Sequence, residues 1–207
     1  MAQVKLTKNE LKAQKDALKR FQRYLPTLQL KKQQLQMVIR QVEAEMREKE
    51  AQREHLQREV MSWVEVFGED MGLENYLKIR SLKTSTGNIA GIDIPVFEEI
   101  RFDELPYDLY VMPLWVDRGI DALKRLLALD AEVRILQRQH ELLSEELRIT
   151  TQRVNLFEKV KIPETKENIR MIRIYLGDQQ TAAVVRGKMA KAAIDAKTAA
   201  EAEPGGL

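Results

Sequence analysis

The side chains that could do chemistry are few, and the sequence does not bring them together. His55 and His140 are the only histidines, no His-x-x-x-His spacing occurs, and the chain has no cysteine. Metal sites need several such ligands at short spacings, so the sequence predicts no metal. Arg186-Gly187-Lys188 is the nearest fragment to a phosphate-binding loop, but it lacks the upstream glycine of that motif. We therefore expect no catalytic residue and no cofactor.

Paired carboxylates are the remaining chemical pattern. Glu98-Glu99 and Glu145-Glu146 could be taken for an acid and base pair. In a chain that is 32% charged, such pairs are more typical of solvated faces. His140 falls in a slot of an apolar repeat, which favours a structural histidine. The sequence therefore predicts a non-enzymatic protein whose function lies in its helices.

The first 67 residues carry one long apolar repeat. Thr7-Lys8-Asn9-Glu10 has the capping-box pattern that starts a helix. Apolar residues then recur in steps of three and four or of seven, which is typical of a coiled coil. The seam includes Leu11, Leu18, Phe21, Leu25, Leu28, Leu35, Ile39 and Val42. We predict an N-terminal long helix over 1–67, with a kink about one turn before Pro26.

A second repeat follows over residues 116–190, and we predict a C-terminal long helix there and a flexible tail over 191–207. Its seam includes Val133, Leu136, Leu143, Leu147, Val154 and Phe157. Two single-seam helices in one chain can bury both seams as an antiparallel hairpin. If residue i faces residue 183 − i, the polar interruption at Arg53 meets the one at Asp130. We therefore predict an all-α dominated fold, a long antiparallel two-helix coiled coil.

Residues 68–115 differ from the helices around them. Glycine and proline punctuate the segment, and apolar residues alternate with polar ones over 77–80 and 92–96. Residues 84–88, Thr-Ser-Thr-Gly-Asn, have the composition of a turn. We predict a small middle unit that contains a β-hairpin. We expect an aromatic cluster in it, made of Tyr76, Phe97, Phe102 and Trp115.

Charge is distributed unevenly along the chain. Residues 1–40 hold ten Lys and Arg against two acids, residues 152–197 hold ten against five, and residues 68–115 hold four against nine. The basic ends fit either a solvated coiled-coil exterior or a positive tip that binds an acidic partner. A nucleic-acid partner is not expected, because the basic residues are not interleaved with aromatic ones. No apolar run is long enough to span a bilayer, so we expect no direct membrane insertion.

The segment 152–163, Gln-Arg-Val-Asn-Leu-Phe-Glu-Lys-Val-Lys-Ile-Pro, resembles a signature of the D-subunit family of the V/A-type rotary ATPases. Residues 167–172, Glu-Asn-Ile-Arg-Met-Ile, resemble the stretch that follows it in that family. The layout of a basic N-terminal helix, a β-containing middle and a long C-terminal helix is similar over the whole chain. The resemblance implies the axle of a rotary motor, a non-catalytic component of the central stalk that couples ATP hydrolysis or synthesis to ion translocation.

The resemblance also implies partners and a location. The partners would be the catalytic and regulatory ATPase ring subunits, the small F-subunit of the stalk and the membrane-ring adaptor. The protein would be cytoplasmic and peripheral to the membrane, in a bacterial complex. Contacts with the ring are expected from basic residues near the chain ends, namely Lys5, Lys8, Lys12, Arg186 and Lys188. The alternatives are a generic coiled-coil adaptor without a motor and a basic helical nucleic-acid binder.

Overall fold

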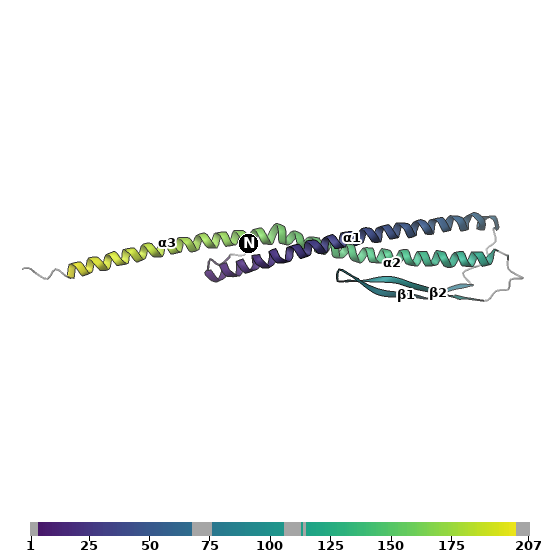
Figure 1. Ribbon diagram of the computed structural model, residues 1–207, viewed down its shortest axis with the longest axis horizontal. Helices are drawn as coiled ribbons and strands as arrows, with labels where there is room; N and C mark the ends of the chain where they lie inside the picture. The colour runs from purple at the N-terminus through teal and green to yellow at the C-terminus, as the bar shows by residue number, and fades with distance from the viewer. Residues whose placement is uncertain (1–3, 68–75, 106–112, 114, 202–207) are drawn as a thin grey trace, which may run out of the picture. The chain divides into compact units, whose positions relative to one another are not determined.

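A computed structural model describes residues 4–67, 76–105, 113 and 115–201 of the chain (Figure 1). Helix α1 (Lys8–Phe67) is followed by strands β1 (Leu77–Ile89) and β2 (Ile92–Glu104). Helix α2 (Val116–Asn155), a π-helical turn η2 (Leu156–Lys161) and helix α3 (Ile162–Glu201) complete the path. Long helices with an antiparallel hairpin between them confirm the predicted fold class. Parts of the predicted middle unit, 68–75 and 106–112, and of the tail, 202–207, lie outside the described residues.

The chain divides into two compact units. Met1–Leu28 and Gln152–Leu207 form unit 1, and Gln29–Thr151 forms unit 2. The division cuts across both long helical segments, because unit 1 combines the two ends of the chain and unit 2 is the continuous stretch between them. The four segments expected from the sequence follow element boundaries instead, and they stay a prediction.

In unit 2, α1 and α2 run antiparallel and bury one shared core. Leu35, Ile39 and Val42 of α1 pack with Leu143 of α2, and Ile94 of β2 joins them. Leu35 and Leu143 are completely buried. The strands lie along α2 (Figure 1). The isoleucines near the tip of the hairpin, Ile89, Ile92 and Ile94, pack in this core. A three-and-four repeat on each helix therefore becomes a seam that the hairpin helps to close.

The hairpin turn differs from the turn expected over 84–88. Those residues lie inside β1, and the turn is Ala90-Gly91, with φ of 53° and 81°. Two positive φ values are what a tight two-residue hairpin loop requires. The Gly91 N–H donates to the Asn88 side-chain oxygen at 3.1 Å. The glycine at position 87 is explained by packing and not by a turn, since a Cβ there would lie 3.0 Å from Cγ2 of Val96.

A second cluster lies at the other end of the hairpin, where β1 meets the start of α2. Leu77, Val116 and Ile120 form its buried centre, with partly buried Tyr76, Phe102 and Trp115 around them. Three of the four aromatic residues expected to cluster are therefore together. Phe97 is separate, because it lies on β2 beside the middle of α2.

In unit 1, α1 begins at the predicted cap. The Glu10 N–H donates to the Thr7 hydroxyl at 3.2 Å, as expected for an N-cap threonine and the third helical residue. The helix is continuous through Pro26. The C-terminal path changes its winding before Pro163, because the Ile162 N–H donates to the Phe157 carbonyl five residues back. Such π-helical turns change the phase of a helical face.

Helix α3 continues past residue 190, where the sequence placed the end of the long helix. Residues 191–201 are helical, which follows from their alanine content, since alanine has the highest helix propensity. The flexibility of the tail stays a prediction. None of the helical segments that the structure describes combines the length and apolarity needed to cross a bilayer.

Candidate functional site: paired helices and exposed surfaces

Ion pairs join α1 and α2 along unit 2. Lys31, Lys49 and Arg53 of α1 lie within 2.7, 2.6 and 3.3 Å of acidic side chains on α2, which are Glu146, Glu132 and Asp130. The His140 ring lies 3.2 Å from Glu43. The register of i facing 183 − i holds without offset for the pairs Arg53 with Asp130 and Glu43 with His140. The same register is off by two positions for Lys49 with Glu132 and by six positions for Lys31 with Glu146.

All of the seam residues predicted from sequence are at least partly buried, in whichever unit they lie. The buried ones are Leu35, Ile39, Val42, Val133, Leu143 and Val154. The partly buried ones are Leu11, Leu18, Phe21, Leu25, Leu28, Leu136, Leu147 and Phe157. Their burial places the apolar repeat inside each helical pair and leaves the polar faces outward.

The signature segment of unit 1 sits at the change of winding. Phe157 lies in η2 and its ring centroid is 5.3 Å from that of Phe21, so the π-helical turn packs directly on α1. The Thr165 hydroxyl, which is 5% exposed, donates to the Lys161 carbonyl at 2.6 Å. Pro163 has no backbone N–H to donate, and the Thr165 hydroxyl supplies a hydrogen-bond donor two residues further along the helix.

An exposed ion pair follows in the same segment. Arg170 donates to both carboxylate oxygens of Glu167, and this hydrogen bonding holds the pKa of the Glu167 carboxyl below its usual value. The equivalent bond from Arg148 lowers the pKa of Glu145, so this carboxylate of the pair Glu145-Glu146 is ion-paired.

The five basic residues expected to contact an ATPase ring are all exposed, and all belong to unit 1. Lys5 precedes α1, Lys8 and Lys12 lie in its first turns, and Arg186 and Lys188 lie on α3. No ion pair to an acid of the described chain is found for any of them. The structure places all five in one compact unit, and their role as contacts stays a prediction.

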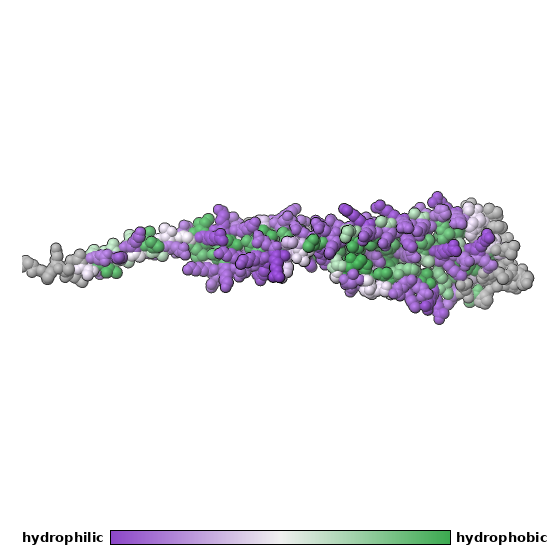
Figure 2. Space-filling view, in the orientation of Figure 1, coloured by the Kyte–Doolittle hydropathy of each residue, from purple (hydrophilic) through white to green (hydrophobic). Residues whose placement is uncertain are grey.

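Apolar side chains accompany these cations on α3. Between Gly177 and Thr198 almost every side chain is exposed, including Val184, Val185, Met189 and Ile194, which are 50 to 68% exposed. Green patches remain at the surface of this helix among purple ones (Figure 2). A helix that exposes apolar residues in this way is suited to contact another protein.

The two units carry opposite net charge. Unit 1 holds 17 Lys and Arg against 9 Asp and Glu, a net charge of +8, and unit 2 holds 17 against 23, a net charge of −6. Residues 1–28 and 152–207 are distant in sequence, but both belong to unit 1. The overall charge of +2 therefore conceals one basic and one acidic unit.

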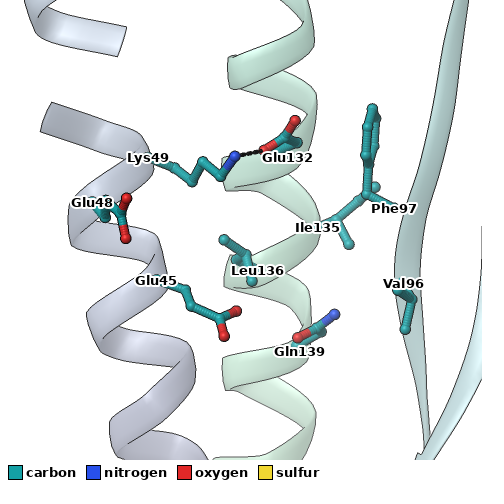
Figure 3. A pocket seen from close by; sticks show the side chains of 9 residues that line it. All are labelled: Glu45, Glu48, Lys49, Val96, Phe97, Glu132, Ile135, Leu136 and Gln139. Atoms are coloured by element: carbon teal, nitrogen blue, oxygen red, sulfur yellow. Dashed lines mark ion pairs between the residues drawn. The ribbon is translucent and has the colours of Figure 1, made fainter. Parts of the chain in front are cut away.

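A groove opens in unit 2 between α1, α2 and β2, with a cavity volume of about 320 Å³. Ile135 lies on the side of α2 that faces Phe97 of β2, and Leu136 lies on the side toward α1, where the carboxylate of Glu45 points into the space between the two helices (Figure 3). The sequence did not reveal this site, because its walls come from three elements. The only signal was the spacing of Glu45 and Glu48, which puts both carboxylates on one face of α1.

The features described above are helical pairs, exposed faces and a groove. Over the ranges that the structure describes, no group of three His, Asp or Glu side chains is placed to hold a metal ion. The fold defines a class of protein, a coiled coil with an inserted β-hairpin.

Comparison with known proteins gives the family. Residues 10–192 match the family model of the ATP synthase D-subunit. A V-type ATP synthase D-subunit of Borreliella burgdorferi is 50% identical over 194 residues, covering 94% of this chain and 96% of that protein. One of Chlamydia pneumoniae is 34% identical over 200 residues, covering 95% and 96%. The chain belongs to the ATP synthase D-subunit family, as the resemblance of residues 152–172 indicates.

Proposed function

We propose that this chain is the central-stalk rotor component of a bacterial V-type rotary ATPase, and that it couples ATP hydrolysis or synthesis to ion translocation. The observation that carries the proposal is the family match, which extends over both long helical segments and the hairpin. The chain's contribution is mechanical, with no catalytic residue of its own. It works peripheral to the membrane on the cytoplasmic side.

The physical form of such coupling is differential contact. A shaft changes the free energy of a surrounding site only if its contacts with that site differ between orientations. The basic unit 1 presents Lys5, Lys8 and Lys12 at the start of α1 and Arg186 and Lys188 on α3, where exposed valines accompany them. These groups are our candidates for contacts with the catalytic and regulatory ring subunits.

Two further partners belong to the proposal. Leu30 and Met37 are 60% and 59% exposed and are one heptad apart on the outer face of α1, which makes them candidates for contact with the small F-subunit of the stalk. The membrane-ring adaptor would contact the chain elsewhere.

The test is charge reversal at the basic helix start. Lys8→Glu with Lys12→Glu should greatly reduce co-purification of an ATPase ring and ATP-driven ion pumping. Arg40→Glu with Arg47→Glu makes the same change at two exposed positions of the same helix in unit 2, and the ring should still co-purify. Unchanged ion pumping in the first double variant would contradict the assigned contacts. If the unsubstituted chain brings down no ATPase ring at all, the adaptor alternative is favoured.

A further inference from the structure

The groove between α1, α2 and β2 has apolar walls that are held in place. Ile135 is 8% exposed and Leu136 packs on the core of unit 2. The Gln139 amide, in a residue that is 7% exposed, donates to the Pro95 carbonyl at 2.6 Å and so ties β2 to α2. Val96 remains 37% exposed. The groove is therefore pre-formed and accessible to a side chain from outside.

The charge at its rim is unbalanced. Lys49 pairs with Glu132 at 2.6 Å across the groove (Figure 3). Glu45 and Glu48 are exposed, and no cation of the described chain forms an ion pair with either of them, although Glu48 accepts a hydrogen bond from the Gln52 amide at 3.2 Å. Elsewhere along the same two helices, Lys31, Arg53 and His140 all have an acidic partner. The four charged side chains that line the groove therefore sum to −2.

We propose that this groove binds a basic segment of a partner protein, with one Lys or Arg side chain lying across α2, between α1 on one side and β2 on the other. Its methylene stem would lie on Phe97 and Leu136, and its charged head would reach Glu45 and Glu48. Long cationic side chains bury their methylene stems on apolar surface in this manner and keep the charged head in a polar environment. The two carboxylates would repel an acidic segment, and a wholly apolar segment would supply no cation for either of them.

The occupant is a protein segment from the assembled complex, so the inference rests on the proposed rotor function. The chain has no cysteine, so a single introduced thiol can report on the groove. Val96→Cys places a thiol at the groove, and Ile79→Cys, at a residue 52% exposed on β1, is the matched control outside it. Maleimide labelling is compared between the isolated chain and the complex purified through it.

Occupation of the groove should slow labelling of V96C about tenfold or more in the complex, with I79C slowed much less. Adding Glu45→Gln with Glu48→Gln should restore labelling by about fivefold, because partly exposed charge contacts are each weak. Glu54→Gln with Glu59→Gln, two exposed acids of α1 outside the groove, should restore none. A benzophenone side chain at position 96 should cross-link to a segment that contains Lys or Arg.

The outcomes separate the two proposals. If the ATPase ring co-purifies but V96C labels as fast as in the isolated chain, the groove is empty and the inference is overturned while the rotor function stands. Insensitivity to E45Q with E48Q, or a cross-link to a segment without a basic residue, also overturns it. If V96C is protected from maleimide but position 96 gives no cross-link, as a bound small organic cation would produce, the proposal of a protein segment in the groove is overturned. Failure of the ring to co-purify removes the rotor function and this inference with it.

Discussion

Truncating the buried seam of unit 2 gives the sharpest test of the helical pairing. Leu143 and Leu35 are completely buried in one cluster. Replacing a buried leucine by alanine lowers the free energy of unfolding by about 2–5 kcal/mol, because apolar burial is lost and a cavity is left behind. Leu143→Ala should therefore lower the urea midpoint strongly. Leu30→Ala, at a leucine of α1 that is 60% exposed, should change the free energy of unfolding by no more than about 0.5 kcal/mol.

The double variant tests whether the two leucines share one core. Because they belong to the same cluster, the loss in Leu35→Ala with Leu143→Ala should differ from the sum of the single losses by about 0.5–3 kcal/mol. Unfolding is followed by far-ultraviolet circular dichroism in urea at several protein concentrations. Equal midpoints for Leu143→Ala and Leu30→Ala would refute the buried seam. A midpoint that rises with protein concentration would show that the seams pair between molecules instead of within one chain.

Three smaller perturbations follow from local geometry. Gly91→Ala should destabilise unit 2 by about 1 kcal/mol in thermal unfolding, because φ is 81° there and a Cβ is strained at that value. Lys49→Ala should cost roughly 0.5 kcal/mol at low ionic strength and less in high salt, which urea unfolding at both salt levels measures, since its pair with Glu132 is partly exposed. Arg170→Ala should raise the pKa of Glu167 in an NMR titration. In the unsubstituted chain this pKa is lowered, so any stability that the pair gives is present above the unfolded pKa of the carboxyl and is lost as pH falls through the folded one.

Sequence reasoning succeeded where one pattern decides one contact. Apolar residues spaced by three and four positions on both helices require a shared seam. Matching the polar interruptions of the two seams limits how the helices can be aligned with each other. The sequence alone could therefore place Arg53 opposite Asp130. The helix start was predictable for a similar reason, because the Thr7 hydroxyl and the Glu10 N–H are local partners.

The failures concern features that depend on neighbours distant in sequence. Residues 84–88 have turn composition, yet threonine is a good strand former, and Thr84 lies opposite Phe97 of β2. The glycine at position 87 is explained by the close approach of the Val96 side chain. Of the two turn residues Ala90 and Gly91, only the glycine is of a type that favours positive φ, so the sequence signal for a turn is weak there. The π-helical turn had no signal except the nearby Pro163, and the groove needs β2 in place before its walls exist.

The ion pairs of unit 2 act more on the register than on the stability of the helical pair. Each is partly exposed and is worth at most about 1 kcal/mol, but the apolar repeat alone would also allow a slip of one heptad. A slip toward the start of α2 would move Arg53 from Asp130 to Leu123 and Lys49 from its glutamate to Arg125. The first change leaves a partly buried guanidinium without an acid, and the second sets like charges together, so the slipped state is penalised twice. For the rotor role that we propose, this is the useful property, because a shaft transmits torque only while its two helices hold one alignment.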